Sequence, residues 1–244
     1  NTTKLVLRDG GRVDASTFAS GLAGSVTINA SSSVEVSGTV PGSVNPSLII
    51  SSANILDEFL QQLLELPALP TGNSGSVSIE TPLLKVTDGA QVTVKNDGTA
   101  NAGTLQINAE SIFLNNEANI SASTKSGQGG DIKLNLQDSL IMRRNSVINA
   151  ESLGTGNGGN ITINSPVILG LENSDIIANA LQGNGGNINI TTQGIFSLEF
   201  RDRLTPDSDI AASSQFGVNG TVEINNLRID PRSAIVSLPP ELAD

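Results

Sequence analysis

A repeated strand that begins at a glycine constrains this chain more than any other feature. Residues 159–164 read GNITIN, and 186–191 repeat the pattern as GNINIT. A glycine followed by alternating apolar and polar residues predicts a β-strand that starts at a turn. The glycines that begin the copies are Gly24, Gly75, Gly103, Gly130, Gly159, Gly186 and Gly220. Because a fixed repeat of about 20 to 50 residues is typical of a solenoid, we expect stacked copies of one unit.

The spacing of these glycines predicts the domain organisation. Between Gly75 and Gly186 they advance by 28, 27, 29 and 27 residues. The first step, of 51 residues, and the last step, of 34 residues, are longer, which predicts insertions at 40–71 and 199–209. The repeat fades over 226–244, where prolines predict a terminal cap or exit. We therefore expect a single domain over the whole chain.

Two further short apolar runs follow the glycine-anchored run in each unit. The second runs are 34–36, 83–86, 112–114, 140–142, 167–171 and 195–198. The third run pairs an aliphatic residue with an alanine two positions later, as in Ile120 and Ala122. Three strands in a repeat of about 28 residues, with coils stacked about 4.8 Å apart, are typical of a parallel β-helix. Since parallel crossovers are right-handed, we expect an all-β, right-handed parallel β-helix of about eight coils, with three short strands per coil.

An asparagine recurs five residues after the anchor glycine. The column consists of Asn29, Asn108, Asn135, Asn164 and Asn225, and Glu80 and Thr191 stand at the same position in the two remaining copies. Asparagine tolerates the left-handed conformation of a tight bend, and its amide can bond a stacked neighbour. This pattern favours a structural column over a ligand site. The anchor glycines are likewise expected to supply a positive φ at a corner.

The first insertion contains the one helical pattern in the chain, NILDEFLQQLLEL at 54–66. The residues that recur at helical spacing are Ile55, Leu56, Phe59, Leu60, Leu63 and Leu64. Asn54 is the expected N-cap, and Pro67 ends the pattern. Two interpretations remain open. The helix is either a lid packed on the side of the solenoid or a docking surface for another subunit or segment.

Charge and composition exclude several classes of function. The net charge of −11 argues against nucleic acid and against attraction to anionic lipid. Cysteine and histidine are absent, which excludes disulfides and thiolate metal sites and removes the commonest general base. No apolar run approaches the roughly 20 residues of a membrane helix, so we expect no direct membrane insertion. We also expect no cofactor.

Asp175 and Asp209 are the only candidates for a metal site. The repeat places them at equivalent positions in adjacent coils, where two carboxylates repel unless a cation lies between them. The alternatives are a metal ion, simple exposure of the carboxylates to solvent, or pairing with an arginine from the charged insertion, either Arg201 or Arg203. We expect exposure or the arginine rather than a metal.

The runs GNGGNITINSPVILGLENSDIIANALQGNGGNINITTQGIF and SDIAASS, within residues 156–214, resemble the repeat region of cyanobacterial filamentous-haemagglutinin-like proteins. The ending, from FGVNGTVEIN to DPRSAIVSLPPELAD, is also similar to the end of that region. The resemblance implies an adhesin built as a β-helix and exported by two-partner secretion through an outer-membrane transporter. The family's secretion domain carries short Asn-Pro motifs, to which only 45–48 is similar here. This chain therefore resembles the downstream part, and no secretion signal is assigned.

These observations favour a non-catalytic, extracellular structural or adhesive segment of a secreted surface protein. The partners expected of it are glycans or proteins of a cell surface or matrix. One alternative is a subunit of a self-assembling surface fibre or sheath, whose partner is another copy of itself. A further alternative is a polysaccharide lyase or hydrolase, because β-helices commonly host these enzymes. Glycoside hydrolysis needs paired carboxylates, for which Asp175 and Asp209 are the only pair that the pattern places, and the chain has no Trp or Tyr to stack on a sugar.

Overall fold

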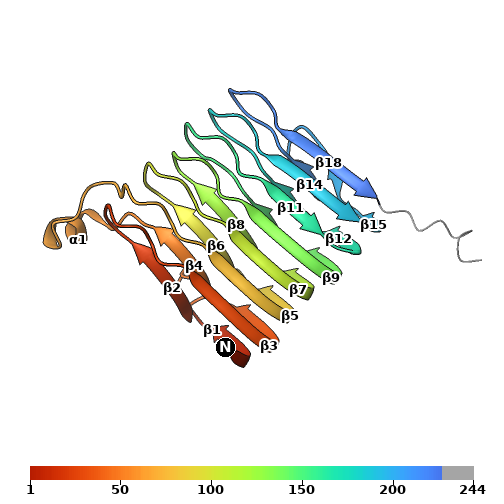
Figure 1. Cartoon of the computed structure of the whole chain (residues 1–244), viewed down its shortest axis with the longest axis horizontal. Helices are drawn as coiled ribbons and strands as arrows, with labels where there is room; N and C mark the ends of the chain where they lie inside the picture. Colours follow the sequence, from red (N-terminus) through yellow and green to blue (C-terminus); the bar gives the residue numbers. More distant parts are fainter. Residues whose placement is uncertain (227–244) are drawn as a thin grey trace, which may run out of the picture.

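A computed structural model describes residues 1–226. The chain is a parallel β-helix whose coils stack in sequence order along one axis (Figure 1). The first sheet, sheet A, contains in spatial order β1 (Thr2–Arg8), β3 (Val26–Ser37), β5 (Val77–Thr87), β7 (Leu105–Asn115), β9 (Ile132–Arg143), β11 (Ile161–Asn164), β14 (Asn187–Thr192) and β18 (Thr221–Asn226). Eight successive strands along this path confirm the expected eight coils.

The second sheet, sheet B, closes the other side of each coil. It contains in spatial order β2 (Arg12–Thr17), β4 (Leu48–Ala53), β6 (Gln91–Asn96), β8 (Asn119–Thr124), β10 (Val147–Asn149), β13 (Asp175–Ile177), β17 (Asp209–Ala211) and β16 (Glu199–Phe200). The strands of each sheet pair in parallel. Alternate side chains from both sheets meet in one continuous aliphatic core between them.

The register of the strands follows the repeat. The column two residues after the anchor glycine is Val26, Val77, Leu105, Ile132, Ile161, Ile188 and Val222. All but the last of these side chains are buried. Each coil thus covers the apolar side chains of its neighbours, which is why small stacked aliphatics suffice for a core in a solenoid.

The expected division into three short strands holds for only part of the rod. In β3, β5, β7 and β9 the first two predicted runs form one strand of 11 or 12 residues. In the next two coils the second run is separate, as β12 (Val167–Leu171) and β15 (Gly194–Phe196). Pro166 precedes β12 and has no N–H to donate to the ladder, which accounts for the first of these breaks.

The predicted insertion at 40–71 is too long. Residues 48–53 form β4, which pairs with β2 and β6 and is buried along its whole length. The pattern of the third run missed this strand because Ser51 stands at the position that is alanine in most other coils, Val94 being the other exception. The true insertions on either side of β4 are 38–47 and 54–71.

The second insertion is also shorter than predicted. The interval 199–209 includes β16 and the first residue of β17, so the loop outside the sheet is 201–208. The cap or exit predicted at 226–244 lies outside the described residues, apart from Asn226 at the end of β18.

The anchor glycines do not have the positive φ that was expected of them. A Cβ on Gly159 would lie 2.0 Å from the carbonyl oxygen of Gly130, and a Cβ on Gly186 would lie 1.9 Å from that of Gly159. Glycine is required there because consecutive coils approach backbone to backbone. Left-handed residues recur instead at another corner, between sheets A and B, as at Asn116 and Glu117 with φ of 58° and 61°.

The asparagine column lies within extended strands, so the left-handed conformation is not the reason for it. Its amides bond along the rod instead. Nδ2 of Asn135 donates to Oδ1 of Asn108 at 3.0 Å, and Nδ2 of Asn164 donates to Oδ1 of Asn135 at 2.9 Å. A second ladder, which sequence reasoning missed, lies two residues before the anchor glycines. It consists of Asn73, Asn101, Gln128, Asn157 and Asn184, whose side-chain oxygens accept backbone N–H groups of the next coil.

The helix is shorter than the predicted 54–66. Helix α1 spans Glu58–Leu63, and Asp57 rather than Asn54 is its N-cap, since the Asp57 carboxylate accepts the N–H of Leu60 at 3.0 Å. The Asn54 side chain instead donates to Ser52 Oγ at 2.6 Å. Among residues 1–226, no helix has both the length and the apolar character needed to cross a membrane.

Candidate interaction surfaces

Helix α1 projects sideways from the N-terminal end of the rod (Figure 1). Its loop is held at both ends. The N–H of Asn54 donates to the carbonyl of Thr17 at 3.0 Å, and the N–H of Thr71 donates to the carbonyl of Ala19 at 3.2 Å. Between these anchors α1 contributes no buried residue. The helix is therefore not a lid, because a lid would bury its apolar side chains against the sheet.

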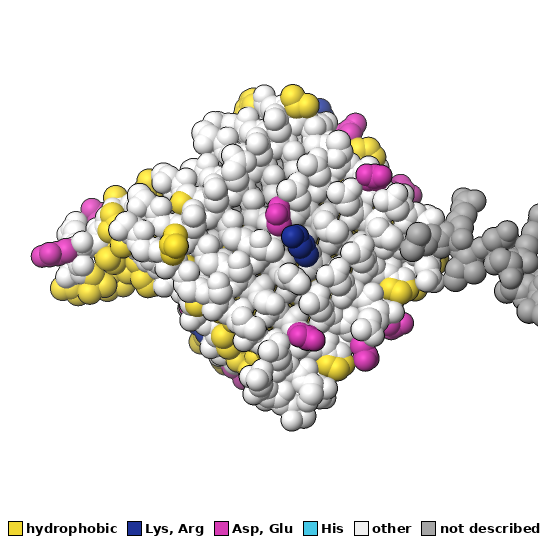
Figure 2. All heavy atoms as spheres, in the orientation of Figure 1, with side chains coloured by type: hydrophobic (Ala, Val, Ile, Leu, Met, Phe, Trp, Pro, Cys, Tyr) yellow, Lys and Arg dark blue, Asp and Glu magenta, His cyan; other side chains and the backbone are white. Residues whose placement is uncertain are grey.

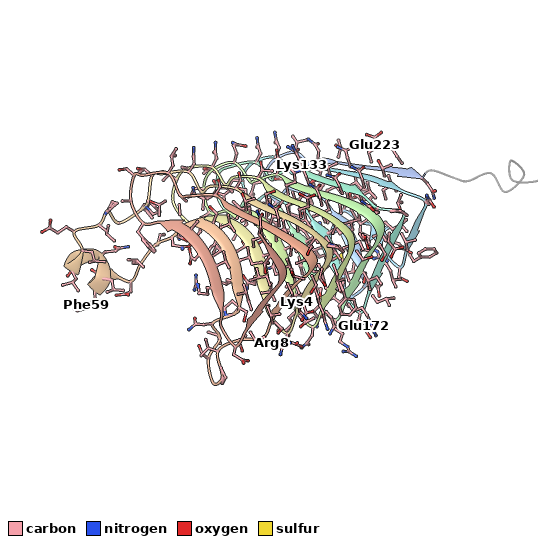
Figure 3. The ribbon with its side chains drawn as sticks, turned by 60° about the horizontal axis from the view of Figure 1, so that its bottom comes forward. Lys4, Arg8, Phe59, Lys133, Glu172 and Glu223 are labelled. Carbon is pink, nitrogen blue, oxygen red and sulfur yellow. The ribbon has the colours of Figure 1, made fainter. Side chains whose placement is uncertain are left out.

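The projecting segment carries an apolar surface, which we call the α1 knob and define as Phe59, Leu63, Leu64 and Leu69. Phe59 is 72% exposed and Leu63 is 64% exposed. Figure 2 shows these apolar side chains gathered on the projection, and Figure 3 shows Phe59 on the helix, away from the sheets. The other three predicted interaction residues, Ile55, Leu56 and Leu60, are half-buried.

Asp175 and Asp209 lie in neighbouring strands, β13 and β17, as the repeat predicted. The backbone N–H of Asp209 donates to Oδ1 of Asp175 at 2.8 Å. The Asp209 carboxylate is fully buried and accepts hydrogen bonds from the Arg201 guanidinium and the Thr205 N–H. Arg203 makes no ion pair among residues 1–226, so Arg201 is the partner.

The two carboxyl groups have opposite pKa shifts. Burial raises the pKa of Asp175; the hydrogen bond from the Asp209 N–H opposes that effect, and the nearby charge of Asp209 adds to it. Burial also raises the pKa of Asp209, but the hydrogen bonds from Arg201 and Thr205 together outweigh burial and hold it below its usual value. Within the described part of the chain, no group of three or more acidic side chains is arranged to hold a metal ion. The cation that contacts Asp209 is the Arg201 guanidinium, whereas Asp175 accepts the Asp209 N–H and has no ion pair among residues 1–226.

A polar groove of about 680 Å³ lies beside this loop. Its lining includes Glu151, Asn179 and Ser213, which follow the sheet B strands β10, β13 and β17, together with Asp202 and Arg203 from the loop. Burial raises the pKa of Glu151, against which a hydrogen bond from Asn149 acts. Sequence reasoning missed this groove, although an acidic residue at Glu151, where the two coils that follow have Asn179 and Ser213, was a detectable signal.

A second groove of about 680 Å³ follows the asparagine column along the bend in sheet A. Asn29, Asn108 and Asn135 line it, together with Glu80 and Glu110. The Asn29 amide bonds to Asn1 and the Asn135 amide bonds to Asn108, whereas Glu80 interrupts the row between them. The asparagines of this groove therefore serve mainly to join neighbouring coils.

Comparison with protein-family models, curated protein sequences and solved structures finds no match for this chain.

Proposed function

We propose that this chain is a non-catalytic, adhesive segment of a secreted surface protein, in which the β-helix is a stiff rod and the α1 knob is the contact surface. The observation that carries the proposal is that α1 buries no residue and exposes its apolar face. An exposed apolar cluster costs free energy in water, so a helix of this kind is typical of a binding surface. The resemblance to haemagglutinin-like repeats supports an extracellular location.

The charges around the α1 knob favour one type of partner. Asp57 and Glu58 lie at the start of the helix, and Glu65 follows its end. An apolar surface with an acidic rim is complementary to an apolar groove with a basic rim. The knob would insert its leucines and Phe59 into such a groove, as amphipathic helices do in helix-in-groove recognition. We therefore propose a matrix or cell-surface protein with a basic-rimmed apolar groove as the partner.

The test uses two variants that each add one negative charge to α1. Leu63→Asp places the charge in the α1 knob, whereas Gln62→Asp places it on an exposed polar position of the same helix. Purified wild-type and variant chains are measured for binding to immobilised matrix proteins and to cells. We expect Leu63→Asp to lose binding and Gln62→Asp to retain it, because only the first buries a charge in the interface.

Thermal unfolding provides the control for folding. Both variants are expected to have the same melting temperature as the wild type, since neither residue is buried in the rod. Equal binding by Leu63→Asp and the wild type would show that the α1 knob is not the contact surface. Absence of binding by the wild type across matrix proteins and cells would contradict the adhesive function itself.

In the alternative of a self-assembling fibre, the partner is a second copy of the chain. Negative-stain microscopy over a concentration series distinguishes the alternatives. Rods that lengthen with concentration would favour the fibre, and short rods of constant length would favour the adhesive segment.

A further inference from the structure

The polar groove is built from two rows of side chains that cross three coils. Parallel bridges link Ser152, Ala180 and Ser214, and the residues before them form the first row, Glu151, Asn179 and Ser213. The residues after the bridges form the second row, Leu153, Leu181 and Gln215. Neighbours within a row are one coil apart, or about 4.8 Å. The groove thus has a polar row and a mainly apolar row side by side.

The inserted loop closes one side of this groove. Arg201 holds the loop to β17 through Asp209 and through a backbone bond from its own N–H to the carbonyl of Ile210 at 3.1 Å. The next two residues, Asp202 and Arg203, line the groove. Among the ion pairs of residues 1–226, neither of them has a partner within 4.0 Å. A carboxylate and a guanidinium are therefore presented to whatever occupies the groove.

The polar row keeps bonding capacity for a ligand. Oε2 of Glu151 accepts from Nδ2 of Asn149 at 2.6 Å, while Oε1 has no hydrogen bond within the described chain. Oδ1 of Asn179 accepts from Ser213, and its Nδ2 has no acceptor among residues 1–226. The groove therefore offers an acceptor at Glu151 and donors at Asn179 and Arg203.

Two classes of ligand fit these groups poorly. The backbone carbonyls of Glu151, Asn179 and Ser213 each accept an N–H from the neighbouring coil, at 3.1, 3.1 and 2.9 Å, so a peptide could not add as a strand. Two carboxylates against one guanidinium give the groove a net negative charge, which disfavours phosphate or sulfate. A neutral ligand with many hydroxyls fits better, because each hydroxyl can both donate and accept.

We propose that this groove binds a neutral oligosaccharide. Its hydroxyls would bond to Glu151, Asn179 and Arg203, and the C–H face of a sugar ring would pack on Leu153 and Leu181. The volume of about 680 Å³ lies within the range of about 300 to 1,000 Å³ that is typical of small-ligand sites. The site lies in the C-terminal coils, whereas α1 projects from the N-terminal end, so it does not depend on the proposed role of α1.

The experiment is an NMR titration of the ¹⁵N-labelled chain with cellobiose, maltotriose, chitotriose and mannotriose. We expect at least one sugar to shift the backbone amides of the two rows while leaving those along the asparagine column unchanged. Glu151→Gln and Arg203→Gln should each weaken binding about tenfold, because each removes a charged hydrogen-bonding group. The matched controls are Glu110→Gln in the sheet A groove and Lys133→Gln on an outward face, and both should bind like the wild type.

Two outcomes would overturn the proposal. One is that none of the four sugars shifts the amides of the two rows. The other is that binding is unchanged in a folded Glu151→Gln, Arg203→Gln double variant. Cleavage of a sugar that stops in Glu151→Gln would support this site but overturn the non-catalytic function proposed above. Loss of matrix binding in Leu63→Asp, with sugar binding retained, would support both sites independently.

Discussion

At the residue scale, the anchor glycines set the distance between coils. A Cβ at Gly159 would approach the carbonyl oxygen of Gly130 to 2.0 Å, and the same contact recurs up the column. The obstructing atom belongs to the backbone of Gly130, whose N–H donates to the carbonyl of Ala122 at 3.0 Å, so it cannot move aside alone. Substitution at such a glycine must separate two coils locally or distort both of them.

We therefore expect Gly159→Ala to lower the free energy of unfolding by about 2 to 3 kcal/mol, the upper part of the range for overpacking. Gly21→Ala is the matched control, because a Cβ there would find only Thr17 Oγ1, at 3.9 Å. It should change stability by less than about 0.5 kcal/mol. Urea unfolding of both variants tests this, and equal stabilities would contradict a steric role for the column.

Asp175 and Asp209 are expected to influence stability in opposite directions. Because burial raises the pKa of Asp175, the stability linked to this group is present below its unfolded pKa of about 3.9 and is lost as pH rises through the folded pKa. Asp175→Asn removes the charge and keeps an oxygen that can accept the Asp209 N–H. The melting temperature of this variant should be higher than that of the wild type at about pH 7, and the difference in melting temperature should vanish near pH 3.

Asp209→Asn provides the comparison of opposite sign. The hydrogen bonds to Asp209 outweigh the effect of burial, so the pKa of Asp209 is lower in the folded chain than in the unfolded chain. This carboxylate therefore stabilises the fold above about pH 3.9, and the stabilisation is lost as pH falls through the folded pKa. The melting temperature of this variant should be lower than that of the wild type at about pH 7, and the two melting temperatures should converge in acid. Melting temperatures measured from about pH 7 to pH 3 test both variants, and shifts of the same sign would refute this assignment.

At the scale of elements, α1 is expected to be independent of the rod. Asp57 caps the helix through the Leu60 N–H, and the helix buries nothing. Asp57→Ala should destabilise the helix locally by about 1 kcal/mol. Hydrogen exchange should become faster at the amides of Leu60 and Gln61, while the melting temperature of the chain stays unchanged. A lower melting temperature would show that α1 supports the adjacent coils.

At the scale of the whole molecule, the core is one continuous stack. How deeply a core side chain is buried depends on its position along the axis of the rod. Ile107 and Ile224 belong to the same column, but Ile107 is fully buried in the middle and Ile224 is 38% exposed in the last described coil. Ile107→Ala should cost about 3 kcal/mol and Ile224→Ala less than about 1 kcal/mol. Chemical denaturation compares the two, and equal costs would contradict a core that depends on neighbours on both sides.

Much of this stack could be predicted from the sequence because the repeat is local. The alternation after Gly159, and its recurrence at similar spacing, identified the strands, their register and the number of coils. Strand β4 was missed because Ser51 broke the expected aliphatic and alanine pair. The ladder through Asn157 was missed because its bonds join residues about 28 positions apart.

The sequence alone determined the architecture, since period-two alternation at a fixed repeat length leaves few ways to bury the apolar side chains. Only the tertiary structure decided the roles of single residues. The anchor glycines serve close stacking, which depends on the distance between coils. Helix α1 is exposed because its two anchored ends hold it off the sheets, and Arg201 rather than Arg203 reaches Asp209 because the loop turns back on β17. These outcomes depend on contacts across space, which no local pattern records.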